Sequence, residues 1–176
     1  MADDYFIKID RIEGESQDAR HRGEIILDAW SFGGTAEGMV GGKPGGAVPG
    51  PVRPGVASGR FSAQDFQFTA KVSKASPKLF EACVTGARLR EAAMSARKAG
   101  AEQQDYLRIK LSDVVISSYQ QGGSSASGEV PVDQVSCSFA RIEIEYKEQR
   151  PDGSLGGSVS VMFDLRRKAP SRKRGR

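Results

Sequence analysis

The amino-acid sequence predicts a mainly β domain, an antiparallel sandwich or barrel, and three observations point to this class. Apolar residues recur at every second position in six separate segments, which is the spacing of strands with one buried and one solvated face. Stretches rich in glycine, proline and serine separate several of these segments. Only one segment carries the start and stop signals of a helix. Strands with one solvated face are typical of antiparallel sheets. A chain of 176 residues is long enough for one domain with a hydrophobic core.

The alternation is clearest in residues 139–146, FARIEIEY. Ile142 and Ile144 fall on one side of the predicted strand, and Arg141, Glu143 and Glu145 fall on the other. The same alternation of apolar and polar residues occurs in DFQFTAK, YLRIKL and the stretch from Val159 to Leu165. In chain order, the six predicted strands are 5–12, 24–32, 65–71, 106–111, 139–146 and 159–165.

A single helix is predicted over residues 76–86, SPKLFEACVTG. Ser76 can cap its start, Pro77 suits the first helical position, and Gly86 suits the stop. Residues 87–100, ARLREAAMSARKAG, are ambiguous: their composition favours a continued helix, while the alternation around Met94 favours a strand. The predicted apolar face of the helix comprises Leu79, Phe80 and Cys83.

Three loops interrupt these elements, at 33–60, 122–129 and 150–157. Residues 33–60 contain ten glycines and four prolines, so neither a strand nor a helix is expected to run through them. A loop of this length is usually functional or disordered. Its GGKPGG lacks the Ser or Thr and the following helix of a phosphate-binding loop, so we expect no nucleotide site there.

The net charge of +4 resides in the C-terminal tail. Residues 166–176, RRKAPSRKRGR, hold seven of the 26 basic residues, and the remainder of the chain has 19 basic and 22 acidic residues. Residues 1–165 are therefore predicted to form one mildly acidic domain, followed by a basic tail. The tail has no aromatic residue to stack on bases, so we expect a solvated terminus; a tether to an acidic partner or contact with nucleic acid stays the alternative.

A polar cluster in residues 12–25, IEGESQDARHRGEI, raises the question of catalysis. Ser16 and His21, the only histidine, lie on a connector between predicted strands, without a nucleophile elbow. The surrounding charged residues favour a solvated connector, so no catalytic residue is predicted. Cys83 and Cys137 lack the spacing of a metal or disulfide framework, so neither a metal nor a cofactor is predicted.

The chain also lacks the features of a membrane or signal-directed protein. No apolar run approaches the ~20 residues of a membrane-spanning helix. The N-terminus, MADDYFIKID, has acids where a secretory signal has a basic stretch. We expect folding in the cytoplasm, and any export by a route that reads no N-terminal signal.

Several segments in order resemble the haemolysin-coregulated proteins, the Hcp family, which form the tube of bacterial type VI secretion systems. The first is IEGESQDARHRGEIILDAWSFG, and the likeness continues through SKASPKLFEACVTG, RKAG, YLRIKLSDVVISSYQQGG and VSCSFARIEIEYKEQRPDGSLGG. Together they cover most of residues 5–165. Five segments in the family's order are a specific signal, whereas one alone is weak.

The resemblance implies a fold and a function. Hcp-like chains form two antiparallel sheets closed into a barrel with one flanking helix, similar to phage tail-tube proteins, and the helix ends near Gly86, so 88–98 is predicted to be a strand. Six copies form a ring, and rings stack into a non-enzymatic tube driven by a contractile sheath. Effectors can occupy the lumen, and a spike protein sits at the tip. The 33–60 loop would be an arm that reaches a neighbouring subunit or ring.

Some features depart from the family pattern. Phe32 stands where many members carry a second tryptophan, the 33–60 loop is long and rich in proline, and the tail is unusually basic. Eleven residues after the barrel are too few for an appended toxin, so a plain tube subunit is expected. The charged side of 139–148 fits a subunit seam, a lumen wall or a solvated surface. The alternative functions are a secreted effector or binding module of the same fold and, on the polar cluster alone, a small hydrolase.

Overall fold

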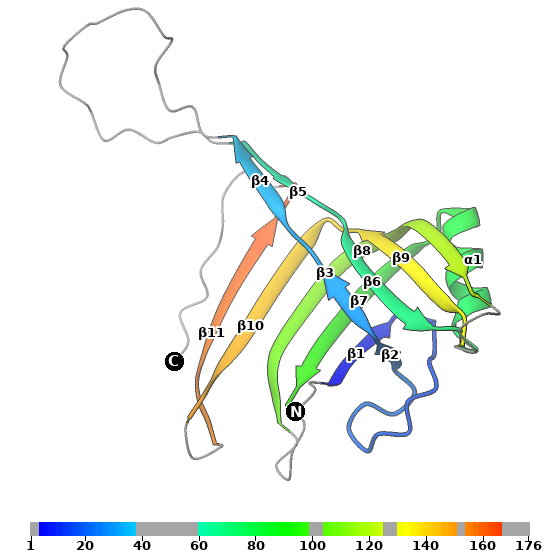
Figure 1. Ribbon diagram of the computed structural model, residues 1–176. Helices are drawn as coiled ribbons and strands as arrows, with labels where there is room; N and C mark the ends of the chain where they lie inside the picture. The colour runs from blue at the N-terminus through cyan, green and yellow to red at the C-terminus, as the bar shows by residue number, and fades with distance from the viewer. Residues whose placement is uncertain (1–3, 38–59, 99–103, 125–129, 151–153, 167–176) are drawn as a thin grey trace, which may run out of the picture.

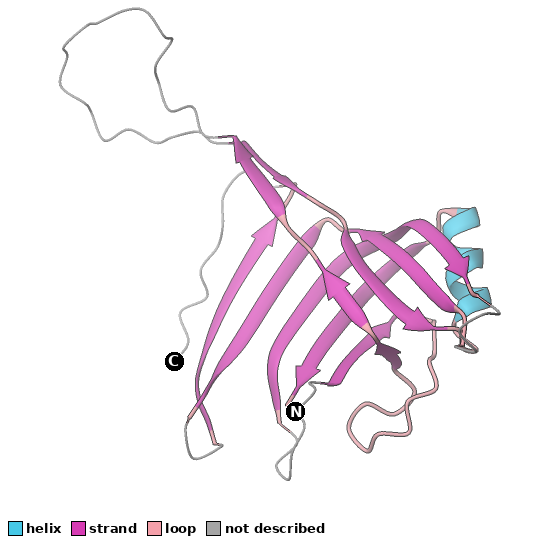
Figure 2. Cartoon of the chain, in the orientation of Figure 1, coloured by secondary structure: helices cyan, strands magenta, loops and turns pink. Residues whose placement is uncertain are grey.

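The computed structural model describes residues 4–37, 60–98, 104–124, 130–150 and 154–166, and these are mostly β-strand (Figure 2). The helix is α1 (Ser76–Thr85). The strands are β1 (Asp4–Ile9), β2 (Ile25–Leu27), β3 (Ala29–Ser31), β4 (Gly34–Glu37), β5 (Arg60–Ala63), β6 (Phe66–Lys71), β7 (Arg88–Arg97), β8 (Asp105–Gly122), β9 (Val132–Ser138), β10 (Arg141–Gln149) and β11 (Leu155–Asp164).

Nine of the strands form one strongly curved antiparallel sheet. Its path is β2-β1-β7-β8-β9-β6-β3, and β10 and β11 branch from it at β8 (Figure 1). On one edge of β8, its first half pairs with β10 and its second half pairs with β9. On the other edge, its first half pairs with β7. Helix α1 lies against one flank of this sheet, and β10 and β11 form the other flank.

Asp113 marks the point where β8 changes partners. Its φ is 54°, a left-handed conformation that a short polar side chain tolerates better than a branched one. Arg166 Nη2 lies 2.6 Å from Asp113 Oδ2, so the end of β11 is fixed to this bend by an ion pair. One strand of 18 residues thereby serves two parts of the sheet.

The hydrophobic core fills the concave interior of the curved sheet. Period-two strands place every second side chain inward, and the inward residues of β1, β6, β7, β8 and β9 are almost fully buried. Helix α1 contributes Leu79 and Ala82 to this core. The largest fully buried core side chains are Ile7, Phe66, Leu79, Met94, Ile109, Leu111, Val114, Ile116 and Val135.

The predicted closed barrel is confirmed only in its coarser features. The structure is mainly β, antiparallel and flanked by one helix among the described residues, but its path of paired strands has two ends, β2 and β3. The predicted strand 24–32 is interrupted at Asp28, whose backbone N–H donates to the Thr69 carbonyl at 2.9 Å. The two end strands, β2 and β3, are therefore joined through Asp28 in the chain but are not paired with each other.

Residues 33–60 were predicted to hold no strand, and this is wrong for Gly34–Glu37, which form β4, while β5 begins at the last residue of the segment, Arg60. β4 and β5 pair as a two-stranded antiparallel arm that projects from the sheet (Figure 1). A Cβ atom at Gly34 would lie 2.3 Å from the Phe61 ring, so glycine permits this close pairing. Residues 38–59, which include GGKPGG, lie outside the described residues.

The predicted helix and the strand after it are confirmed, with two local corrections. Gly86 ends α1 at φ 61°, and 88–97 is a strand because its alternate side chains enter the core. Ser76 is not the cap, since the N-cap is Ala75 and the Ser76 hydroxyl instead contacts buried Asp133. Phe80 does not belong to the buried face, which Leu79 and Ala82 provide.

Candidate assembly surfaces

The connector between β1 and β2 is anchored, and the prediction that it is solvated is wrong for Ser16 and His21, although Gln17, Arg20 and Arg22 are exposed as predicted. Ser16 and His21 are both buried. The His21 Nδ1 atom lies 2.9 Å from Glu24 Oε2, and Nε2 lies 3.1 Å from Asp105 Oδ1. Both ring nitrogens therefore face carboxylates and not the Ser16 hydroxyl, which accepts a 3.3 Å hydrogen bond from the Asp18 backbone. This geometry fixes a loop and does not activate a nucleophile.

Buried Arg97 is the second anchor of the connector. Its Nη1 atom lies 2.7 Å from Asp18 Oδ2, and its Nη2 atom lies 3.4 Å from Asp4 Oδ2. The Phe6 ring stacks on His21 at 4.4 Å and has the Arg97 guanidinium 5.0 Å from its centroid. Burial raises the pKa of Asp18, but hydrogen bonds from the backbone and from Arg97 outweigh it and lower the pKa below its usual value.

A buried carboxylate also holds α1 to the sheet. Asp133 on β9 accepts hydrogen bonds from the hydroxyls of Ser76 and Tyr119, the latter at 2.9 Å, and from Gln121 Nε2 at 3.0 Å. Burial and the neighbouring Asp133 raise the pKa of Tyr119 to about 12. The three donors come from α1 and β8, so the position of the helix is set by a polar network as well as by Leu79.

The two cysteines do not form a disulfide. Cys83 and Cys137 are both free, and burial raises the pKa of the Cys137 thiol to about 12, far from that of a nucleophile. The residues described contain no cluster of three or more His, Cys, Asp or Glu able to hold a metal ion. Within the same part of the chain, no helix has the length and hydropathy needed to cross a membrane.

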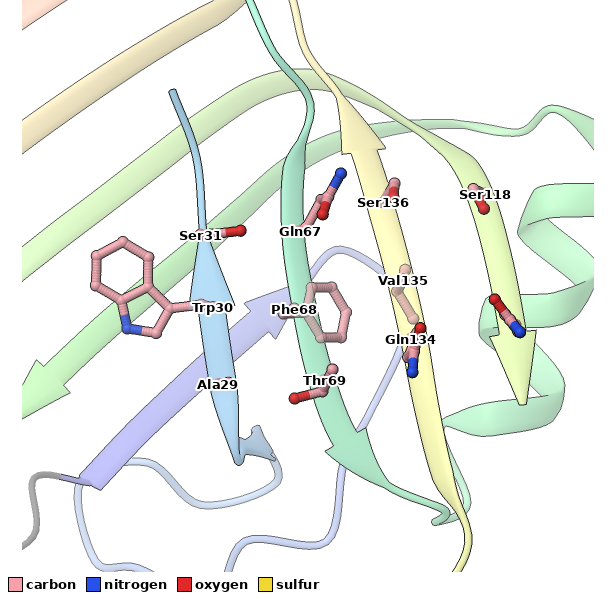
Figure 3. A pocket seen from close by; sticks show the side chains of 11 residues that line it. Ala29, Trp30, Ser31, Gln67, Phe68, Thr69, Ser118, Gln134, Val135 and Ser136 are labelled. Atoms are coloured by element: carbon pink, nitrogen blue, oxygen red, sulfur yellow. The ribbon is translucent and has the colours of Figure 1, made fainter. Parts of the chain in front are cut away.

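The outward side of β3, β6, β9 and the second half of β8 carries two rows of uncharged side chains, which we call the uncharged face. Cross-strand register aligns Ser31, Gln67, Ser136 and Ser118 in one row, and Ala29, Thr69, Gln134 and Gln120 in the other. These residues line a shallow hollow of about 370 Å³ (Figure 3). Alternate residues, such as Phe68 and Val135, point into the core. Hydroxyl and amide groups can donate and accept hydrogen bonds without attracting ions over a distance.

The outward side of the first half of β8 and of β10, together with Glu91 on β7, forms a charged face. Glu143 stands directly opposite Lys110, and Glu145 stands opposite Arg108. Lys110 Nζ also reaches Glu91 Oε2 at 2.8 Å. Opposite charges in cross-strand register stabilise a sheet by about 0.2–1 kcal/mol per pair. The sequence predicted this alternation, but it did not reveal that the uncharged residues of four strands align, because cross-strand register is not local.

Two patches of exposed apolar side chains lie on the opposite flanks. On α1, Phe80 and Val84 are 55% and 68% exposed, and on β10 and β11, Tyr146, Val159 and Val161 are 45%, 72% and 44% exposed. β11 pairs only with β10, so its outer edge has no strand partner among the described residues. Contiguous exposed apolar surface and a free strand edge are both typical of interaction sites.

Comparisons with known proteins identify the family. Residues 6–146 match the family described as "Type VI secretion system effector, Hcp". The protein hcp1 of Pseudomonas aeruginosa is 37% identical over 168 residues, which cover 94% of this chain and 97% of that protein. A crystal structure of a type VI secretion system effector from Yersinia pestis is 30% identical with a TM-score of 0.70 and covers 92% of this chain and 99% of that one. The crystal structure of Hcp1 from Salmonella typhimurium is 26% identical with a TM-score of 0.75 and covers 97% of this chain and 100% of that one.

Proposed function

The chain belongs to the Hcp family and is a structural subunit of the type VI secretion tube, and we propose that six copies of it close into a ring and that these rings stack. A closed ring of identical subunits is built by head-to-tail contacts, so each subunit needs two different surfaces that match. It also needs an inner and an outer wall. The contrast between the uncharged and the charged face supports this arrangement.

In the proposed ring, the uncharged face lines the lumen. Cargo in a tube must be held and later released, and scattered hydroxyl and amide groups give short-range hydrogen bonds to many partners. The hollow between Gln67 and Gln134 offers a contact point for effectors. The charged face would then form the outer wall towards the contractile sheath, where its exposed charges can contact complementary ones.

Closure of the barrel is part of this proposal. β2 and β3 are separated only by Asp28, and β2 pairs with β1 while β3 pairs with β6. We propose that these two short strands act as one bent strand that completes the barrel in the assembled ring. A closed barrel leaves few free edges and gives a rigid wedge.

The arm of β4 and β5 is proposed to reach beyond its own subunit. Phe61 on β5 contacts Phe163 on β11 edge to face at 5.2 Å, which fixes the root of the arm to the sheet. We propose that the rest of the 33–60 loop contacts a neighbouring subunit or ring. Removing residues 38–58 should weaken ring formation or stacking, and unchanged assembly of that variant would contradict this role.

Export follows from the same assignment. We propose that the protein folds in the cytoplasm, leaves through the type VI system without an N-terminal signal, and meets a spike protein at the tube tip.

The ring itself is tested by measuring particle mass and shape. Purified protein should give particles of six subunits in light scattering and hollow rings in electron micrographs. A persistent monomer at high concentration would contradict the ring and favour the alternative, a secreted module of the same fold that acts alone.

A further inference from the structure

His21, the only histidine of the chain, is buried between two carboxylates. Its Nδ1 atom lies 2.9 Å from Oε2 of Glu24, on the same connector, and its Nε2 atom lies 3.1 Å from Oδ1 of Asp105, the first residue of β8. An ionised carboxylate only accepts hydrogen bonds, whereas a neutral imidazole has one N–H group and one lone pair. Both contacts are therefore hydrogen bonds only when each ring nitrogen carries a hydrogen.

The charges around the ring favour this doubly protonated state. The charged side chains of the network come from the connector (Asp18 and Glu24), from β1 (Asp4), from β7 (Arg97) and from β8 (Asp105). Four carboxylates thus share one permanent cation, Arg97, and a positive charge on His21 reduces the excess of negative charge. The side chains of His21 and Glu24 are 5% and 15% exposed, which leaves little room for water to replace a lost hydrogen bond.

We propose that His21 is a pH-sensitive clamp. As the imidazolium it locks the connector between β1 and β2 to the start of β8, and the loss of one proton releases it. A neutral ring turns a lone pair towards one of the two carboxylates, so one charge-assisted hydrogen bond is replaced by repulsion. The ring can then hold Glu24 or Asp105, but not both. The clamp lies within one chain, so it does not depend on the proposed ring of six copies.

The direction of the pH effect follows from the proton count. A histidine in an opened segment is mostly neutral above about pH 7, so closing the clamp takes up a proton there. A fall in pH therefore favours the closed form, and a rise of one pH unit increases the opened fraction by up to about tenfold. The connector forms one wall of a surface hollow of about 930 Å³ beside Lys8 and Lys74, so its opening changes the surface that a partner meets.

Hydrogen exchange of the full-length protein measures this opening. The Gly14 N–H donates to the Gly23 carbonyl at 2.8 Å, and the Gly23 N–H donates to the Ser16 carbonyl at 2.9 Å. Between about pH 7 and about pH 8.5, protection of these two N–H groups, corrected for the intrinsic rate of exchange, should fall at least about threefold per pH unit. Protection of Ile109 and Leu111 in the core of β8 should not change. Protection of the connector that is independent of pH would overturn the proposal.

Removing one carboxylate separates the clamp from a general effect of pH. In Glu24→Gln the amide can donate to Nδ1, so a neutral ring can hold both partners. This variant should keep the connector protected and lose the pH dependence. Glu13→Gln is the matched control on the same connector, since Glu13 is 82% exposed, and it should behave as the wild type. PH dependence that persists in Glu24→Gln would contradict the clamp.

The proton itself can be located, because labelling with ¹⁵N-histidine reports this ring alone. At about pH 7.5, with the connector closed, both ring nitrogens should show the chemical shifts of N–H groups. As the pH rises, one nitrogen should change to the shift of a lone-pair nitrogen while the connector loses protection. Magic-angle-spinning NMR of sedimented protein records this at any particle size. A ring that already lacks one hydrogen while the connector is closed would refute the proposal.

Discussion

In the first half of β8, Arg108 and Lys110 point outward opposite glutamates of β10, whereas in its second half Ser118 and Gln120 point outward opposite a serine and a glutamine of β9. The buried positions change parity at Asp113, since Ile109 and Leu111 are buried before it and Val114 and Ile116 after it. The change occurs at Asp113, where the strand leaves β10 and joins β9. One strand thus contributes to two surfaces of different chemistry, which a tube subunit uses for its inner and outer walls under the proposed arrangement.

The interior sides of these two regions also differ, and substitution of Asp133 is expected to have the largest effect on stability. Apolar residues such as Ile109 and Leu111 lie behind the charged face, but Asp133 with its three donors lies behind one end of the uncharged face. Asp133→Ala leaves those donors without their acceptor. We expect the free energy of unfolding to fall by about 2–4 kcal/mol, measured by urea denaturation.

The neighbouring residue supplies the control for this prediction. Gln134→Ala changes an outward side chain of the same strand and should alter the free energy of unfolding by less than about 0.5 kcal/mol. If the two variants lose the same stability, the network does not hold the helix and the uncharged sheet together.

The junction at Asp113 is expected to have the next largest effect. Asp113→Val forces a branched side chain into a left-handed conformation and should cost about 1–2 kcal/mol. Asp113→Asn removes the exposed ion pair with Arg166 but tolerates the same backbone, so its loss should stay below about 1 kcal/mol. Thermal unfolding of the two variants separates backbone strain from charge, and equal losses would place the effect in the ion pair.

The charge pattern itself is tested by reversing one residue. Glu143→Lys places like charges opposite each other at Lys110 and should cost about 0.5–1 kcal/mol at low salt. Adding Lys110→Glu restores opposite charges across the two strands, although it places Glu next to Glu91. Denaturation at low and high salt reports the pair, because salt screens exposed charges. A cost that is independent of salt would argue against an electrostatic origin.

The sequence predicted the elements whose alternation is undisturbed and failed where distant residues decide. β6, β10 and β11 follow from simple alternation, and the strand 88–97 was predicted with the help of the family resemblance. β9 was missed because its buried Asp133 interrupts an apolar pattern. The connector was predicted to be solvated because its charges look exposed locally, yet His21 pairs with Asp105, 84 residues away. Local patterns cannot report a partner at that separation.

The smallest expected effect on stability, with the most direct bearing on function, belongs to the uncharged face. Gln67→Lys and Gln134→Lys add charge to the hollow but touch no core residue, so we expect a change in the free energy of unfolding below about 0.5 kcal/mol. Ring formation should persist. If this face lines the lumen, the added ammonium groups should change the amount and the identity of effectors that co-purify, because a charged wall repels basic cargo and retains acidic cargo. The matched control is Glu143→Gln on the charged face, which should leave cargo unchanged. Cargo that responds to Glu143 and not to Gln67 would invert the assignment of the two walls.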